Sequence, residues 1–198
     1  MLDCKELRKV NKQIKVEDIP KINETIKEII RLSQVARHYG LLELEIEANK
    51  KETNKFLADG LMLIVDGNDP EYVELILRNI YYVNGYKGIK ALQTLMVIEG
   101  LLAIQAGTNP YVILEILLSM VSDKIKLADK LLDNGSYESK FEFIDEISKE
   151  VSDEANIVNI ETKQKKKKAK KKAKNEDNLV GMLTQEEVKE LSTKPTEE

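Results

Sequence analysis

The sequence is poor in the residues that build disulfides and most transition-metal sites. Its 198 residues include one cysteine, Cys4, and one histidine, His38. A single cysteine excludes an internal disulfide, and disulfide-free proteins are typical of the cell interior. Metal sites that need several histidine and cysteine ligands are excluded in the same way. We therefore expect no metal and no cofactor, and we interpret Cys4 as a thiol without a chemical role.

Aromatic residues and long apolar runs are also scarce. Aromatic residues make up 5% of the chain, with no tryptophan, whereas charged residues reach 33%. This composition favours helices with charged outer faces over a β-sandwich or barrel. The most apolar stretches are interrupted by Gln93, Glu99 and Glu115, whereas a membrane span needs about 20 predominantly apolar residues. The sequence thus predicts a soluble, cytoplasmic protein.

Motifs of known catalytic chemistry are missing as well. The chain has no Gly-rich phosphate loop, no nucleophile elbow and no metalloprotease motif, although each of these leaves a recognisable spacing in a sequence. We predict that the protein is not an enzyme and has no small-molecule substrate.

The chain divides by composition into a helical part and a tail. We expect residues 1–18 to form a short irregular lead-in with one turn of helix at most. Residues 19–152 should form one helical domain, because apolar residues recur there at steps of three and four. In that domain the first helix begins near Asp18 and Pro20 and runs to about Asn49, bending near Gly40. Further helices are expected at residues 52–65, 70–84, 86–106, 110–121, 123–132 and 137–151.

Two segments of the helical domain match each other at an offset of 40 residues, namely 60–77 and 100–117. Both read as helix, glycine, Asp or Asn cap, proline and helix, which is the usual order of helix stop and start signals. We therefore predict an all-α fold, a compact bundle of about six or seven helices that contains this hairpin twice. The second repeat occupies residues 86–121.

The C-terminal part is basic at its centre. Nine lysines and two alanines lie between Lys163 and Lys174, and such a run repels itself and stays disordered. We expect residues 153–181 to form a disordered linker. The lysines could attract nucleic acid or an anionic membrane through phosphate contacts, or they could act only as a solubilising spacer.

A short amphipathic helix is predicted after this linker, at residues 182–192. Thr184 and Glu187 have the spacing of a capping box, and a capped helix on a tether is a common form of docking peptide. Its docking residues would be Leu183, Gln185, Glu186, Glu187, Val188 and Leu191.

Two opposite charges in the first predicted helix form a candidate partner-binding site. On one continuous helix, Arg37 and Glu45 are separated by about 80° in projection and would border one stripe beside Leu41 and Leu44, which we expect to be buried. Such a stripe suits a partner with a complementary charge pattern. Solvated helix charges without a partner are the alternative interpretation.

The same region resembles a known family. Residues 36–45 read ARHYGLLELE and residues 56–70 read FLADGLMLIVDGNDP, and with their spacing they resemble the cytoplasmic region of MotA-like stator subunits of the bacterial flagellar motor. The resemblance spans residues 32–82. It implies contact with the rotor, with Arg37 and Glu45 at the positions of the charged residues that act there. The family's membrane helices have no counterpart, so ion conduction is not expected.

The C-terminal segment adds a second, shorter resemblance. The run LTQEEVKEL at residues 183–191 is similar to the docking segment of rotor switch proteins of the FliM type. Together these resemblances imply a soluble accessory of the flagellar motor, placed at the motor's periphery, that binds rotor or stator proteins through a charged helical surface. The alternative is a generic helical scaffold whose lysine-rich tail binds nucleic acid or an anionic membrane.

Overall fold

The computed structural model describes residues 4–122, 140 and 142–153. Over these residues the protein is all-helical and contains no strand, which confirms the predicted all-α character. The chain divides into two compact units, Met1–Val151 and Ser152–Glu198, and the features below belong to the first. The predicted 123–132 helix, the linker from residue 154 onward and the docking helix lie outside the described residues.

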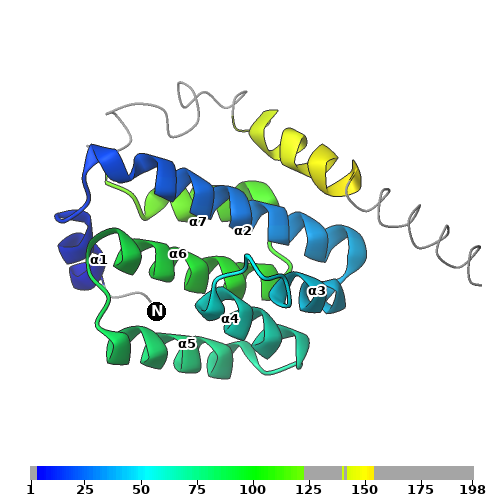
Figure 1. Ribbon diagram of the computed structural model, residues 1–198, viewed down its shortest axis with the longest axis horizontal. Coiled ribbons are helices and arrows are strands. Elements are labelled where there is room, and N and C mark those ends of the chain that lie inside the picture. The colour runs from blue at the N-terminus through cyan, green and yellow to red at the C-terminus, as the bar shows by residue number, and fades with distance from the viewer. Residues whose placement is uncertain (1–3, 123–139, 141, 154–198) are drawn as a thin grey trace, which may run out of the picture. The chain divides into compact units, whose positions relative to one another are not determined.

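The described part of the first unit contains seven labelled α-helices and most of a further helix at residues 142–153, of which residues 142–151 belong to this unit (Figure 1). The labelled helices are α1 Cys4–Asn11, α2 Ile19–Tyr39, α3 Leu44–Ala48, α4 Lys55–Val65, α5 Pro70–Asn84, α6 Gly88–Gln105 and α7 Pro110–Ser119. Two single turns of 3-10 helix, η1 Val16–Asp18 and η2 Leu41–Glu43, precede α2 and α3.

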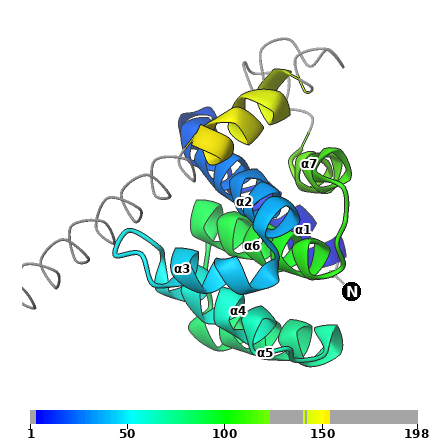
Figure 2. The same cartoon turned by 90° about the vertical axis from the view of Figure 1, so that its right-hand side faces the viewer.

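Helix α6 lies at the centre of the unit. It contacts α1, α2, α4, α5 and α7, and the two views show it between α2 on one side and α4 and α5 on the other (Figures 1 and 2). Among the described residues α6 alone is long and apolar enough, by length and composition, to span a membrane, and 56% of it is buried inside the protein. An apolar surface on all sides is also what the central helix of a bundle requires.

The N-terminal segment departs from the predicted irregular lead-in. Residues Cys4–Asn11 form α1, and Val10 is buried in the core. The Asn11 side chain donates to the carbonyl of Met120 at 2.9 Å and accepts from the amide of Ser122 at 2.8 Å. These bonds tie α1 to the end of α7, a tertiary contact that the local pattern of so short a helix does not reveal.

The first long helix ends earlier than predicted. Instead of running to Asn49, α2 stops at Tyr39, because Gly40 adopts φ 91° and ψ 164°, which lies outside the helical region. A non-glycine residue rarely takes such a positive φ. The chain then turns through η2, and α3 packs against α4. The sequence placed Gly40 at a bend, whereas the structure has a complete break there.

The α4–α5 and α6–α7 connections have the same hydrogen-bonding pattern. Gly67 and Gly107 both have positive φ, 74° and 68°. The amide of the next residue bonds back to the helix in each case, Asn68 to Leu63 at 3.3 Å and Thr108 to Ala103 at 3.0 Å. This is the Schellman pattern that ends a helix, and a proline opens the following helix in both connections.

The helix at residues 142–153 covers α2 and α7. Its buried residues are Ile144, Ile147 and Val151. Lys27 of α2 pairs with Glu150 at 3.2 Å, and Tyr111 of α7 donates to Asp145 at 3.5 Å. The structure therefore has a packed helix over most of the segment predicted at 137–151.

Candidate functional site

The structure places Arg37 and Glu45 on two different helices. Arg37 lies in the last turn of α2 and Glu45 in the first turn of α3, with Gly40 and η2 between them. The expected separation of about 80° on one continuous helix is therefore wrong, because the helix breaks at Gly40. Both side chains are nevertheless exposed, and they flank the same turn of the chain.

Apolar side chains are exposed beside these two charges. Leu42 is 74% exposed, Ile46 56% and Tyr39 44%. We call this surface the α2–α3 corner and define it by Arg37, Tyr39, Leu41, Leu42, Glu45 and Ile46. An exposed group of large apolar residues bordered by charges is typical of a protein-binding surface.

Burial at the corner differs from the prediction at one of two leucines. Leu44 is fully buried, as expected, but Leu41 is 37% exposed. Because η2 interrupts the helix, Leu41 no longer follows the helical spacing that would have turned it inward with Leu44. The apolar part of the corner is therefore larger than the sequence suggested.

An ion network fixes α3 against α2. Arg31 of α2 donates to Glu47 of α3 at 2.6 Å and to Glu28 at 3.1 Å, and Lys50 lies 2.8 Å from Glu47. The hydroxyl of Thr53 donates to the carbonyl of Glu47 at 2.7 Å. Arg31 and Glu47 are largely buried, so their charges are only weakly screened by solvent. The network holds the corner in one geometry.

The pKa values of this network follow from its contacts. Burial raises the pKa of Glu47, but hydrogen bonds from Arg31 and Lys50 lower it by more, so the pKa lies below its usual value. Burial lowers the pKa of Arg31, and the hydrogen bonds to Glu28 and Glu47 outweigh that effect, so its pKa is raised. Both groups are charged at neutral pH. Sequence reasoning missed this pair because its partners lie sixteen residues apart, on helices whose packing no local pattern predicts.

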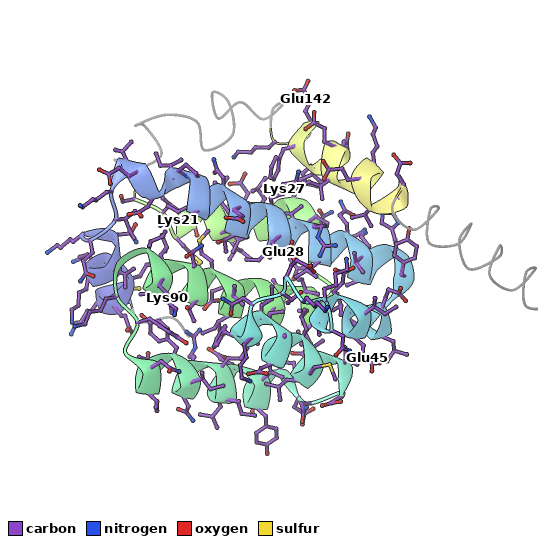
Figure 3. All side chains as sticks on the ribbon, viewed as in Figure 1. Lys21, Lys27, Glu28, Glu45, Lys90 and Glu142 are labelled. Carbon is purple, nitrogen blue, oxygen red and sulfur yellow. The ribbon has the colours of Figure 1, made fainter. Side chains whose placement is uncertain are left out.

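Arg37 and Glu45, the two predicted partner-binding residues, differ from Arg31 and Glu47 in their contacts. Within the described part of the chain, neither Arg37 nor Glu45 forms an ion pair, whereas the arginines Arg31 and Arg78 are each bound to two carboxylates. Figure 3 shows Glu45 at the edge of the fold beside α3. Exposed charges without internal partners can form ion pairs with another molecule at small desolvation cost.

His38 lies next to the corner and contacts the 142–153 helix. Its Nε2 atom lies 3.4 Å from the hydroxyl oxygen of Ser148 in the 142–153 helix. The ring of Tyr39 is 6.1 Å from the ring of His38. The imidazole therefore helps to position the end of α2 against this helix, and we assign it no chemical role.

A groove of about 810 Å³ lies away from the corner, between α2, the start of α4, the end of α5 and the start of α6. Figure 3 labels Lys27, Glu28 and Lys90 on this face. Lys27 pairs with Glu150, and Lys90 stacks over the ring of Tyr86 at 4.9 Å. Neither Arg37 nor Glu45 lines the groove.

One catalytic arrangement is ruled out among the described residues of the groove. Its described lining residues include no histidine, cysteine or serine, so a nucleophile with an adjacent imidazole base cannot be assembled from them. The described residues also contain no group of three or more side chains suited to hold a metal ion.

Two predicted sites lie outside the described residues. These are the docking residues Leu183, Gln185, Glu186, Glu187, Val188 and Leu191, and the lysine run from Lys163 to Lys174.

No protein-family model, no curated protein and no solved structure matches this chain.

Proposed function

We propose that this protein is a cytoplasmic, MotA-like accessory of the flagellar motor that binds a rotor or stator protein through the α2–α3 corner. The flagellar part of the proposal is supported by the resemblance of residues 36–45 and 56–70. The binding part is supported by one observation, the exposure of Leu42 and Ile46 beside two charges that form no ion pair within the described residues.

The chemistry of the corner suggests how a partner would be recognised. Leu42 and Ile46 would enter an apolar depression on the partner and supply most of the affinity, as central apolar residues do in other interfaces. Arg37 and Glu45 would lie at the rim and select the orientation, because opposite charges on the two sides of an apolar centre favour one register.

We further propose that the fold arose by duplication of a helical hairpin, with α4 and α5 as one copy and α6 and α7 as the other. The support is the matching hydrogen-bond pattern of their connections, at an offset of 40 residues, together with a proline at the start of each second helix. In this proposal the first copy, α4 and α5, carries the stator-like motif at residues 56–70. The second copy supplies the central helix α6.

The test is co-purification of the full chain with rotor switch and stator proteins, combined with a swimming assay. We expect Arg37→Glu and Glu45→Lys each to weaken capture about 3- to 10-fold, and Leu42→Asp to weaken it by more than tenfold, because a central apolar contact contributes about 2 kcal/mol or more. Matched controls are Lys21→Glu, an exposed charge near the other end of α2, and Val112→Asp, an exposed apolar residue on α7.

Two results would contradict the proposal. One is the absence of any motor protein among the captured partners while deletion of the gene leaves swimming unchanged. The other is equal loss of capture in the control variants, which would place the contact elsewhere on the protein.

A further inference from the structure

Helix α5 carries a second exposed apolar surface. Its inner residues Val73, Leu77 and Tyr81 are buried against the core. The opposite face exposes Val83 (87%), Tyr72 (59%) and Leu75 (56%). We call this face the α5 stripe and define it by Tyr72, Leu75, Ile76, Asn79, Tyr82 and Val83. At 100° per residue these positions fall within an arc of about 120°.

Four apolar residues of the stripe are arranged symmetrically about its one polar member, Asn79. Asn79 lies three residues from both Ile76 and Tyr82, and four residues from both Leu75 and Val83. It is also near the middle of the arc. The amide of Asn79 is exposed and makes no hydrogen bond to another side chain or to backbone within the described residues. An amide both donates and accepts, so it is able to pair with a copy of itself.

From this symmetry we infer that the α5 stripe binds a second copy of the chain, with the two α5 helices antiparallel and a two-fold axis at Asn79. Such an axis places Leu75 opposite the partner copy's Val83 position and Ile76 opposite its Tyr82 position. A two-fold contact requires a surface that complements itself, and equal spacing of apolar residues on both sides of an amide meets this requirement.

The charges at the two ends of α5 favour the same arrangement. Glu71 is exposed at the start of the helix, and Lys87 is exposed just beyond its end. Each lies eight residues from Asn79, so an antiparallel pair brings the acidic end of one copy toward the basic end of the other. A parallel pair would place like charges together at both ends, which is unfavourable.

The size of the stripe sets the expected strength of the dimer. Five half-exposed apolar side chains offer several hundred Å² per copy, which is less than the standard interface of about 800 Å² per partner. We therefore expect a reversible dimer with a dissociation constant in the micromolar range. The inference does not depend on the proposed function, since α5 and the α2–α3 corner are different surfaces.

The first test measures the mass of the full chain by sedimentation over a dilution series up to about 100 µM, where a micromolar dimer is populated. Leu75→Glu and Val83→Glu are each expected to weaken the dimer more than tenfold, because both copies carry the substitution in the interface. Val83 is almost fully exposed, so its substitution cannot disturb the fold. Val112→Glu on α7 and Leu42→Asp at the corner are controls that should leave the dimer unchanged.

The second test checks the position of the axis by oxidation of cysteine variants in a Cys4→Ser background. Asn79→Cys lies at the axis and should form a disulfide-linked dimer. Glu71→Cys should not, because the two copies of this position would be about 24 Å apart, far beyond the reach of a disulfide. A chain that stays monomeric at the highest concentration, a dimer that persists in Val83→Glu, or equal cross-linking of both cysteine variants would overturn the inference.

Discussion

Helices α2 and α6 pack closely at Gly100. The structure therefore predicts whether a side chain added at this position raises or lowers the free energy of unfolding. A Cβ atom added at Gly100 would lie 2.5 Å from Cγ2 of Ile29, and 3.1 and 3.2 Å from two more atoms of the same side chain. Ordinary contact begins at 3.4 Å. Gly100→Ala therefore forces Ile29 or the two helices apart, although alanine is the better helix former.

The two effects differ in size. Replacing glycine by alanine inside a helix gains about 1 kcal/mol, whereas overpacking a tight core costs about 1–3 kcal/mol. Ile29 is fully buried, and a β-branched side chain in a helix has essentially one rotamer, so it cannot turn away. The overpacking cost should therefore lie near the upper end of its range, at about 2–3 kcal/mol, and we expect Gly100→Ala to lower the free energy of unfolding by about 1–2 kcal/mol.

Gly60 in α4 is the matched comparison. An added Cβ there also meets a neighbour, but the contact is the terminal Cδ1 atom of Leu101, at the far end of a side chain that branches at Cγ rather than at Cβ. We therefore expect Gly60→Ala to cost about 1 kcal/mol less than Gly100→Ala. Urea unfolding followed by circular dichroism measures both values, and an unchanged m-value shows that the variants unfold in the same way.

The Ile29→Ala background provides the decisive control. That variant alone should cost about 2–5 kcal/mol, and it removes all three crowding atoms. Gly100→Ala should then stabilise the protein by about 1 kcal/mol, because only the gain in helix propensity remains. If Gly100→Ala stabilises the unmodified protein to the same degree, the packing of α2 on α6 described above is incorrect.

The remaining predictions concern the α2–α3 ion network and the helix caps. Glu47→Gln should lower the free energy of unfolding by about 1–3 kcal/mol at pH 7, since Arg31 loses a buried partner. Because the folded-state pKa of Glu47 is lowered, its stabilisation is present above the ordinary glutamate pKa and is lost as the pH falls through the folded value. Unfolding measured from pH 7 to pH 3 should thus show a shallower decline for Glu47→Gln, and parallel curves would argue against the pair. Asn109→Ala should cost about 1 kcal/mol because the side chain caps α7 through the amide of Tyr111 at 2.9 Å, whereas Asp69→Ala should cost less because Asp69 makes no side-chain cap bond; equal losses in thermal unfolding would refute this difference.

Local signals in the sequence were sufficient for the fold class and most helix boundaries. Proline at the start of α5 and α7 and glycine after α4 and α6 act within a few residues of the chain. Their effect is backbone geometry and local hydrogen bonding, which tertiary packing changes little. For this reason the ends of these helices were predicted well.

The candidate site was predicted only in part. Arg37 and Glu45 are exposed as expected, and a charge pattern by itself indicates solvent. The sequence could not show that Gly40 breaks the helix fully, since a glycine is compatible with either a bend or a stop. Leu41, Leu42 and Ile46 thus became exposed neighbours of the two charges only when η2 and α3 formed.

Hydrophobic spacing marks which residues can be buried, but not which of them find a partner. Ile76 and Leu77 of α5 fit the same helical pattern, yet Leu77 is fully buried and Ile76 faces outward with the α5 stripe. The pairing of Arg31 with Glu47 is likewise invisible locally. Sequence alone determined that the described chain is helical and where the turns after α4, α5 and α6 lie, because those depend on near neighbours. Only the tertiary structure decided which faces are covered, because burial depends on helices distant in the chain.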